Sequence, residues 1–587
     1  MPSKRSWIYD ILLIAVLAVA AYLRLTGVQW GEGQHQHPDE LFLTGVVENL
    51  RAHACMDEGV SIDICPPERQ RWMTIGEYFD TATSTLNPRN RGAGFYVYGN
   101  LPVTLIRVTY EAIPEIKGFL AGKGGWLSNL SEGFDTGPMK YFGRQFSALA
   151  DLFTILILYF IVERLYNQKV ALQAAAFSSL AVMQIQQSHF FTVDLFMNPF
   201  MFAALYFAVR IAYDGRQVDT YTGTHVDTEI ESPNSYPLTP NSPSSFLRNP
   251  LFWHSLLFGL FLGMAAASKI NAVVMAVVLP VALWLRFART EDRGRKTEDE
   301  DKHAEDEIHS SPNSYLLTPN SLSRIFIFLT IGGLATILAF RVFQPYAFDT
   351  LLPNQQWLEN MSEIRAQATG LADLPWNLQW ARRTHLYSFT NLTVWGLGLP
   401  LGILAWTGFL VMGWRIFKHR ETRHLLLWGW TAIYFVWQSL QFNATMRYQL
   451  PIYPLLAMMA AWVVDKYTSK QVDTYTGKQV TRNSYLVPIS YLLSGIVLIL
   501  TAIWAFAFLN VYTRPETRMD ASRWIYQNVP APINLRYTDG TSQPLPYPAE
   551  ASIANGAPYL TTFIATTDGA LTEILLPHVL GTPASTQ

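Results

Sequence analysis

The chain has 587 residues, of which 50% are hydrophobic and only 15% are charged, against about 25% charged residues in ordinary soluble domains. Its mean hydropathy is +0.13, and several apolar runs reach the roughly 20 residues that cross a bilayer. The formal net charge of −2 gives no sign of a nucleic-acid partner. The composition therefore argues against a soluble protein and predicts an all-α, polytopic membrane protein.

The first apolar run, Trp7–Leu25, directly follows Lys4 and Arg5. Because it is long and no small-residue cleavage site follows it, we interpret it as a retained helix and not as a cleaved signal peptide. Later apolar runs are of comparable length, and with the first they predict about eleven spans. They lie at about 142–162, 169–187, 191–212, 251–267, 271–288, 324–343, 391–414, 425–441, 449–464 and 487–510.

Lysine and arginine near the ends of the spans predict the orientation of the chain, because short cytoplasmic loops carry an excess of both. A cytoplasmic N-terminus places residues 27–140 and 513–587 on the extracytoplasmic side. We expect a transmembrane domain over residues 1–512 and an extracytoplasmic tail after it. The loops that then lie inside are mostly short and basic or polar: 163–169, 213–250, 289–323, 415–424 and 465–486.

Three of these inside loops contain repeated words rich in Ser, Thr, Pro and Asn. Gln217–Gly223 and Gln471–Gly477 have the same seven residues. The pattern is typical of low-complexity inserts, here within 213–250, 289–323 and 465–486. Because insertions persist where they disturb nothing, we expect the functional face to be the extracytoplasmic one.

The chain has two cysteines, Cys55 and Cys65, and both lie in the long first loop at 27–140. In an extracytoplasmic segment, a disulfide between them is favoured over two free thiols. Two cysteines at this spacing are a poor zinc signature. The sequence therefore favours a disulfide that closes a short loop.

The tail differs in composition from the spans. Thr513–Asn528 predicts a short helix, and Tyr559–His578 predicts a β-hairpin that turns at Asp568–Gly569. A hairpin alone is rarely stable. We therefore expect the tail to be the start of a β domain, as in a chain that is part of a longer protein.

Two adjacent carboxylates, Asp39 and Glu40, end the polar stretch that follows the first span. At an extracytoplasmic membrane surface, a carboxylate can take a proton from a hydroxyl group of a substrate. Pro38 before them is also typical of an ordinary helix start, in which the two acids would only face solvent. The pair is a candidate catalytic feature, and the helix start is its structural alternative.

Two histidines, His35 and His37, alternate with Asp39. On an extended segment alternate residues face the same side, so the three would form a possible metal site. Exposed histidines are the simpler interpretation. A divalent metal is therefore possible, but the sequence does not indicate one, nor any other cofactor.

The ends of several spans place further polar groups on the extracytoplasmic face: Arg144, Asp194, Lys269, Arg341, Tyr346, Arg447 and Tyr448. Ionisable groups at membrane depth are costly and tend to be functional, and arginine and lysine suit the phosphate of an amphipathic donor. Three of them have an ordinary alternative: Asp194 as a helix cap, Lys269 as an interface anchor, and Arg447 as a contact to a lipid headgroup. Their gathering on one face favours a joint function.

Five short motifs follow the order seen in glycosyltransferase family 39, and the sequence resembles this group of GT-C membrane glycosyltransferases over roughly residues 1–530. The group includes protein O-mannosyltransferases and aminoarabinose transferases that act on lipid A. The resemblance implies a polyprenyl-phosphate sugar donor, an extracytoplasmic site with a catalytic acidic pair, and inversion of the sugar linkage. The motifs are His37–Glu40, Gly143–Leu149, Thr192–Asp194, Gly263–Lys269 and Arg447–Pro454.

The sequence therefore predicts an integral membrane glycosyltransferase that moves a mannose-like hexose or a pentose to an extracytoplasmic protein, lipid or glycan. Asp39 is the expected general base, and Glu40 is expected to orient a partner or bind the acceptor. A transporter of an envelope precursor or lipid-linked substrate is the alternative, but no inverted repeat supports it; a non-catalytic scaffold is a third interpretation. The expected donor-binding residues are Lys269, Arg447, Arg144, Tyr346 and Asp194.

Overall fold

The computed structural model is mostly helical, as the composition predicts, and describes residues 6–57, 59–123, 137–214, 247–288, 319–372, 374–468, 471–472, 479–480, 486–528, 532–545, 558 and 560–576. Most of the low-complexity inserts predicted at 213–250, 289–323 and 465–486 therefore lie outside the described residues. The chain divides into two units: Met1–Val28 with Gln36–Leu509, and Gln29–His35 with Asn510–Gln587.

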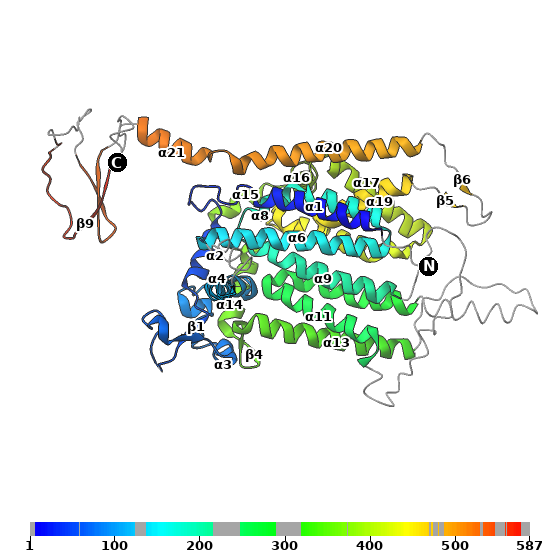
Figure 1. Cartoon of the computed structure of the whole chain (residues 1–587), viewed down its shortest axis with the longest axis horizontal. Helices are drawn as coiled ribbons and strands as arrows, with labels where there is room; N and C mark the ends of the chain where they lie inside the picture. The colour runs from blue at the N-terminus through cyan, green and yellow to red at the C-terminus, as the bar shows by residue number, and fades with distance from the viewer. Residues whose placement is uncertain are drawn as a thin grey trace, which may run out of the picture. The chain divides into compact units, whose positions relative to one another are not determined.

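Within the described part of the chain, eight segments are helical, long and apolar enough to cross a membrane. The eight are α1 (Trp7–Leu25), α6 (Met139–Leu165), α9 (Val193–Tyr213), α11 (Pro250–Ser268), Ile270–Ala288, α13 (Pro319–Phe343), α17 (Leu399–His419) and Leu492–Ile525, which covers most of α20 (Leu486–Thr513) and α21 (Thr517–Asn528). In Figure 1, helices α6, α9, α11 and α13 of the first unit run side by side.

Three further predicted spans form helices that are shorter than a typical span. Residues 169–187 divide into α7 (Gln168–Ser179) and α8 (Val182–Ser188), with an extended residue, Ala181, between them. α18 (Leu425–Ser439) has 15 residues and α19 (Tyr453–Thr468) has 16, fewer than the roughly 20 that cross the hydrocarbon core. The structure therefore supports eight candidate spans and does not establish the predicted count of eleven.

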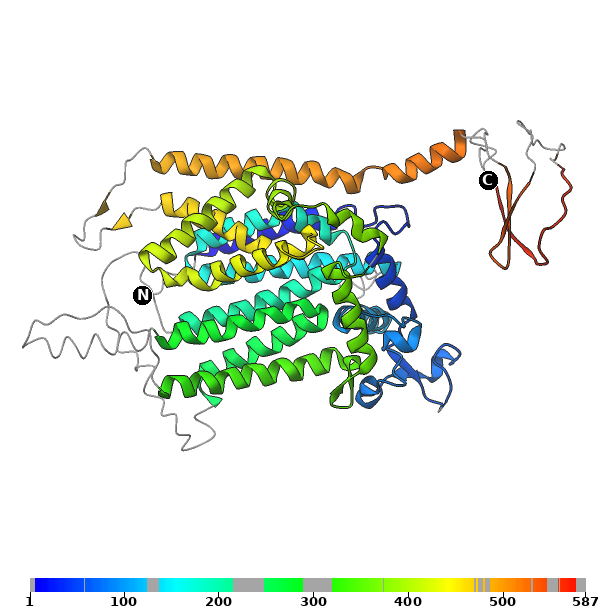
Figure 2. The same ribbon diagram turned by 180° about the vertical axis from the view of Figure 1, so that it is seen from behind.

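Glycines bring neighbouring helices into close contact where α11 packs against α13. A Cβ atom built on Gly259 would lie 2.1 Å from the carbonyl oxygen of Gly332, and one on Gly263 would lie 2.6 Å from that of Thr336. Small residues let helix backbones approach closely, which is how helices pack where no hydrophobic effect drives them together. Through this contact α13 packs against α11. It lies at one edge of the bundle in both Figure 1 and Figure 2.

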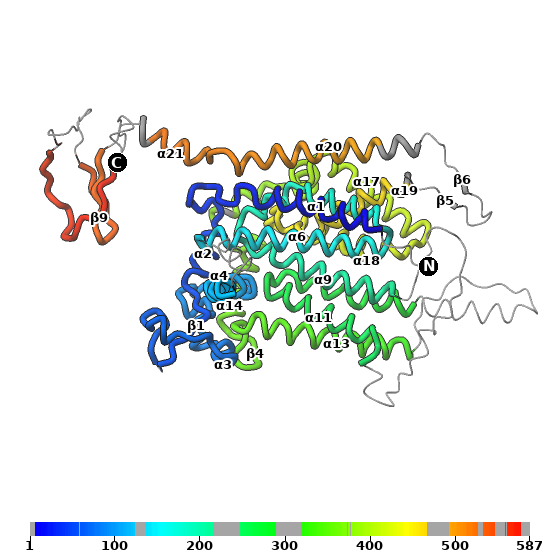
Figure 3. The backbone as a smooth tube through the Cα atoms, viewed as in Figure 1, coloured from blue at the N-terminus to red at the C-terminus, as the bar shows by residue number. Residues whose placement is uncertain are grey.

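The first loop, predicted as largely polar, folds into a small layer with its own core. Its main helices are α2 (Pro38–Asn49) and α4 (Asn100–Ala121), and α4 is drawn end-on in Figure 1, across the ends of the spans. Buried apolar side chains from α2 and α4, among them Leu43, Val47, Val103 and Ile106, pack together there. Figure 3 traces this part of the backbone in blue.

Short strands complete the first loop. β1 (His53–Cys55) pairs antiparallel with β2 (Gln70–Trp72), and α3 (Ile75–Phe79) begins with a capping box between Thr74 and Glu77. Cys55 and Cys65, the pair expected to form a disulfide, are bonded, with 5.7 Å between their Cα atoms. The disulfide therefore ties β1 to the segment before β2.

The remaining elements are short; η3 begins the candidate span Ile270–Ala288, and the others connect the elements named above. They are η1 (Pro67–Arg69), η2 (Pro88–Arg91), η3 (Ile270–Val277), η4 (Pro345–Ala347), β3 (Phe348–Asp349), β4 (Leu352–Pro353), α14 (Gln355–Thr369), η5 (Pro375–Asn377), α15 (Leu378–Ala381), α16 (Leu386–Asn391), η6 (Leu392–Gly396), η7 (Thr422–His424), η8 (Met446–Ile452), β5 (Gln471–Val472) and β6 (Gln479–Val480).

The second unit contains a three-stranded antiparallel sheet in the order β8–β7–β9. β7 (Asn534–Tyr537) is central and pairs with β8 (Ser542–Pro544) and β9 (Leu571–Leu575). The hairpin predicted across Tyr559–His578 is therefore wrong. Of that segment, the described residues form one strand, β9, whose partner is β7 about 35 residues earlier in the sequence.

Candidate functional site

The start of α2 orients the two adjacent acids. His37 caps the helix, because its Nδ1 accepts a hydrogen bond of 3.2 Å from the backbone N–H of Asp39, and Pro38 occupies the first helical position, where a missing N–H costs nothing. Asp39 and Glu40 therefore both lie in the first turn of α2. Adjacent residues of a helix point about 100° apart, so the two carboxylates have different surroundings.

Asp39 forms an ion pair with Arg447. The distance from Arg447 Nη1 to Asp39 Oδ2 is 2.6 Å, and the two side chains are 19% and 20% exposed. Arg447 belongs to η8, so this pair joins the first loop to the segment before α19. Burial acts to lower the pKa of the Arg447 guanidinium, but the charges of Asp194 and Asp39 outweigh burial and raise this pKa.

A second ion pair lies against the same residues. Lys269 Nζ is 2.5 Å from Asp194 Oδ1 and 4.2 Å from the centre of the Tyr448 ring. The Cζ atom of Arg447 is 5.5 Å from the same ring. Tyr448 therefore brings the two cations to one place, and with Asp39 and Asp194 they form a cluster that we call the Asp39 group.

Local backbone structure explains how these residues meet. Lys269 ends α11 in an extended conformation, which lets the next residues begin η3. Asp194 lies in the first turn of α9, after the extended cap residue Thr192. Each residue of the Asp39 group therefore lies at or next to the end of a helix, where the chain changes direction.

Glu40 is fully buried and pairs with Arg144 of α6. Two hydrogen bonds of 2.7 Å join the guanidinium Nε and Nη2 to the two carboxylate oxygens, and the backbone N–H of Phe191 donates to Oε1 at 2.9 Å. Arg144 also donates to the carbonyl oxygen of Val28 at 2.8 Å. The pair joins the segment after α1, helices α2 and α6, and the segment before α9.

Tyr346, predicted at the donor site, lies elsewhere. It is buried in the core of the first loop, its hydroxyl is 2.8 Å from the Ser84 hydroxyl, and its ring meets Tyr78 edge-on. The structure thus brings together Asp39, Lys269, Arg447 and Asp194 of the predicted set. It places Glu40 with Arg144 and puts Tyr346 in a separate core.

The ring of His37 has a hydrogen-bond donor next to each nitrogen. The N–H of Asp39 points at Nδ1, and Arg447 Nη1 lies 3.1 Å from Nε2. A neutral imidazole has one acceptor nitrogen and one N–H donor. At one of the two ring nitrogens, an N–H group therefore faces another N–H donor. Burial and the charge of Arg447 lower the pKa of His37, which keeps the ring neutral at pH 7.

The sequence places His35 and His37 as candidate metal ligands. Among the residues that the structure describes, no group of three or more His, Cys, Asp or Glu side chains is arranged to hold a metal ion. The ring of His37 instead contacts the α2 backbone, Arg447 and the Phe190 ring. The first of these contacts makes His37 the cap of α2.

Tyr98 and its neighbour Gly99 contribute to the site and were not predicted. Burial and the charge of Asp39 raise the pKa of the Tyr98 hydroxyl, which stays protonated beside that carboxylate. A Cβ atom on Gly99 would lie 2.0 Å from the carbonyl oxygen of Ala267, two residues before Lys269. The loop 98–100 thus packs directly on the turn that carries Lys269, a contact between distant segments for which the sequence has no local signal.

A comparison of sequence families agrees with the predicted resemblance. Residues 140–225 match the family described as dolichyl-phosphate-mannose-protein mannosyltransferase. This segment includes Arg144 and Asp194. The resemblance of the chain to GT-C membrane glycosyltransferases is thereby confirmed over this segment. None of the curated proteins compared with the chain matches it.

Several solved structures are similar to the chain at low sequence identity. The Archaeoglobus fulgidus oligosaccharyltransferase in its apo form is 12% identical, with a TM-score of 0.44, and the match covers 90% of this chain and 59% of that one. Cupriavidus metallidurans ArnT bound to undecaprenyl phosphate is 14% identical, with a TM-score of 0.43, and the match covers 87% and 76%. The chain thus spans about three fifths of the archaeal protein.

Proposed function

We propose that this protein is a membrane glycosyltransferase that moves a sugar from a polyprenyl-phosphate carrier to an acceptor hydroxyl. The observation that carries this proposal is the Asp39 group, in which a carboxylate and two cations meet around Tyr448. A carboxylate is suited to accept a proton, and fixed cations are suited to stabilise a leaving phosphate. The family match over residues 140–225 supports the same chemistry.

The donor phosphate is expected to bind between Arg447, Lys269 and His37. Nε2 of His37 faces Arg447 Nη1 at 3.1 Å, and an acceptor oxygen placed beside both groups would satisfy both. A phosphodiester oxygen is such an acceptor, and pairs between a guanidinium and a phosphate are strong. The apolar helices around the site would hold the polyprenyl chain.

Asp39 is the proposed general base. The acceptor oxygen attacks the anomeric carbon of the sugar, and its proton passes to the Asp39 carboxylate. The bond between the anomeric carbon and the phosphate oxygen breaks, and the phosphate leaves with the electron pair beside Arg447 and Lys269. Attack on the face opposite the phosphate inverts the linkage.

Glu40 and Arg144 are proposed as positioning residues. Their carboxylate and guanidinium are fully buried and bonded to each other, so neither is directed at a substrate. Removal of one partner would leave an uncompensated buried charge, which is strongly destabilising. We therefore assign proton transfer to Asp39 alone.

The site is proposed to lie on the extracytoplasmic side, with the N-terminus in the cytoplasm. The same loop that contains Asp39 contains the disulfide between Cys55 and Cys65, and disulfides persist in oxidising compartments. The proposed donor sugar is a mannose-like hexose or a pentose, and the proposed acceptor is a protein, lipid or glycan.

A transfer assay with labelled polyprenyl-phosphate sugars tests the proposal. We expect Asp39→Asn to lower kcat by about 10²–10⁴-fold, the usual contribution of a general base, while donor binding is kept. Glu48→Gln is the matched control, because Glu48 is an exposed acid on the same helix. Full activity of Asp39→Asn would remove the base assignment. Movement of the labelled lipid across vesicles without transfer would favour the transporter.

A further inference from the structure

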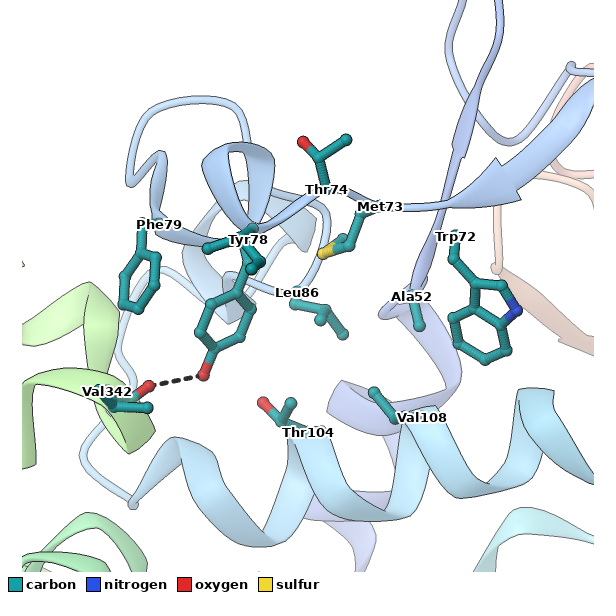
Figure 4. Close-up of a pocket in the computed structure, with 11 residues that line it drawn as sticks. Ala52, Trp72, Met73, Thr74, Tyr78, Phe79, Leu86, Thr104, Val108 and Val342 are labelled. Atoms are coloured by element: carbon teal, nitrogen blue, oxygen red, sulfur yellow. Dashed lines mark hydrogen bonds between the residues drawn. The ribbon is translucent and has the colours of Figure 1, made fainter. Parts of the chain in front are cut away.

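An apolar cavity of about 470 Å³ lies in the first loop, and none of its lining residues belongs to the Asp39 group. Its walls are the segment 72–75 with Tyr78 and Phe79, the α4 residues Thr104 and Val108, and Val342 of α13 (Figure 4). The Tyr78 hydroxyl donates to the carbonyl oxygen of Val342 at 2.8 Å and so has its own partner. The volume is within the range of ligand pockets.

The cavity borders an exposed apolar face of α13, with Val342 belonging to both. Val342 is the second-last residue of α13. This candidate span is mostly exposed, because only 22% of its most apolar stretch is buried. Leu334, Leu338 and Val342 follow one another at four-residue intervals, so they lie on one face, and they are 56%, 64% and 42% exposed. This apolar stripe leads along the span to the cavity.

A cation lies at the same end of α13. The guanidinium Cζ of Arg341 is 5.0 Å from the centre of the Phe79 ring, which lines the cavity, and 5.3 Å from that of Phe348. Its hydrogen bonds are to the carbonyl oxygens of Thr350 and Pro345, at 3.2 and 3.4 Å. Among the described residues no carboxylate forms an ion pair with it, and a guanidinium has five N–H donors.

We propose that the cavity binds one acyl chain of an anionic membrane phospholipid, whose phosphate pairs with Arg341. The exposed apolar stripe on α13 selects a lipid over a soluble ligand, because a phospholipid with its phosphate at Arg341 can place one acyl chain along this stripe and the other in the adjoining cavity. The cation at the membrane surface selects an anionic headgroup, since basic residues there attract anionic lipids. This lipid site does not depend on the proposed transfer reaction.

Photolabelling of the full-length protein in vesicles tests the lipid site. The probe is a phosphatidylglycerol with a photoactivatable diazirine in one acyl chain, in trace amount in phosphatidylcholine vesicles, and adducts are mapped by mass spectrometry. We expect adducts in the peptide 72–79 and at Val342. Arg341→Gln should lower the adduct yield there about fivefold, because one basic residue near the membrane surface contributes about 1 kcal/mol to the binding of an anionic lipid. Arg365→Gln, on the exposed surface of α14, should leave the yield unchanged.

A second variant separates the cavity from the general lipid-facing surface. Val342→Phe narrows the cavity at a half-exposed position, so adducts in 72–79 should fall while those at Leu334 persist. The proposal is overturned if 72–79 is unlabelled, if Arg341→Gln labels as fully as the natural protein, or if polyprenyl phosphate displaces the probe. None of these readouts depends on sugar transfer, so failure here is distinguishable from failure of the proposed function.

Discussion

Gly99→Ala is expected to reduce transfer strongly because Gly99 touches the turn that carries Lys269. A Cβ atom there would lie 2.0 Å from the carbonyl oxygen of Ala267 and 2.4 Å from that of Ser268, whereas ordinary contacts begin near 3.4 Å. Both neighbours are backbone atoms, which cannot rotate away as a side chain can. The loop and the turn must therefore separate by more than an ångström.

The size of the effect follows from this displacement. A misplacement of about 1 Å in a catalytic site can cost about 10²-fold in rate, and overpacking typically costs 1–3 kcal/mol of stability. Gly99→Ala should therefore lower kcat/KM about 100-fold while most of the protein stays folded. The movement would separate Tyr98 from Asp39 and shift Lys269 from its place near Tyr448.

The assay is transfer of a labelled sugar, with thermal unfolding measured in parallel. Gly118→Ala is the matched control, because Gly118 lies within α4 and a Cβ atom there would meet nothing within 4 Å. It should keep full activity and gain up to about 1 kcal/mol, since alanine is the better helix former. Equal activity of Gly99→Ala and Gly118→Ala would refute the inference that this contact positions the site.

Two further substitutions test single contacts. His37→Asn keeps a side-chain acceptor for the Asp39 N–H, as asparagine is a good helix cap, but loses Nε2; we expect the donor Kd to rise about tenfold, the value of one charge-assisted hydrogen bond, measured with polyprenyl phosphate. Asp151→Asn leaves Arg24 without its partner at 2.6 Å, in a pair with both side chains fully buried. It should therefore cost about 3–5 kcal/mol in denaturant unfolding.

Each of these has a clear contrary result. Unchanged donor affinity in His37→Asn would contradict the placement of a phosphate oxygen beside Nε2 of His37. Stability of Asp151→Asn equal to that of Glu48→Gln would show that the Arg24 charge reaches solvent or another partner.

The helical class and the candidate site could be predicted because both depend on local patterns. Runs of apolar residues identify α1, α6 and α9 directly, and the acids and cations of the site lie at the ends of such runs. The site residues themselves come from short motifs near Asp39, Asp194, Lys269 and Arg447. Which of them meet depends on helix packing that a single sequence does not encode locally.

Other features could not be read from the sequence for identifiable reasons. Apolar runs at 425–441 and 449–464 suggested full spans, but the second begins with η8, where Pro451 lacks the N–H that an α-helix needs. The β7–β9 pairing joins residues far apart in the chain, whereas a hairpin signal concerns neighbours only. Tyr98 and Gly99 lie in a long polar loop with no periodic pattern.

The two neighbouring acids, Asp39 and Glu40, show how the start of a helix gives adjacent side chains different surroundings. Asp39 and Glu40 each pair with an arginine, and sequence alone assigns them similar roles. The Glu40 pair is fully buried with both oxygens bonded, whereas the Asp39 side chain remains 20% exposed, so of the two acids only Asp39 is accessible from outside the protein. Because one helical step turns the side chain by about 100°, a shift of one residue in the start of α2 would exchange these environments. The capping contact of His37, which fixes the start of α2, therefore determines which of the two acids is buried with Arg144 and which pairs with Arg447.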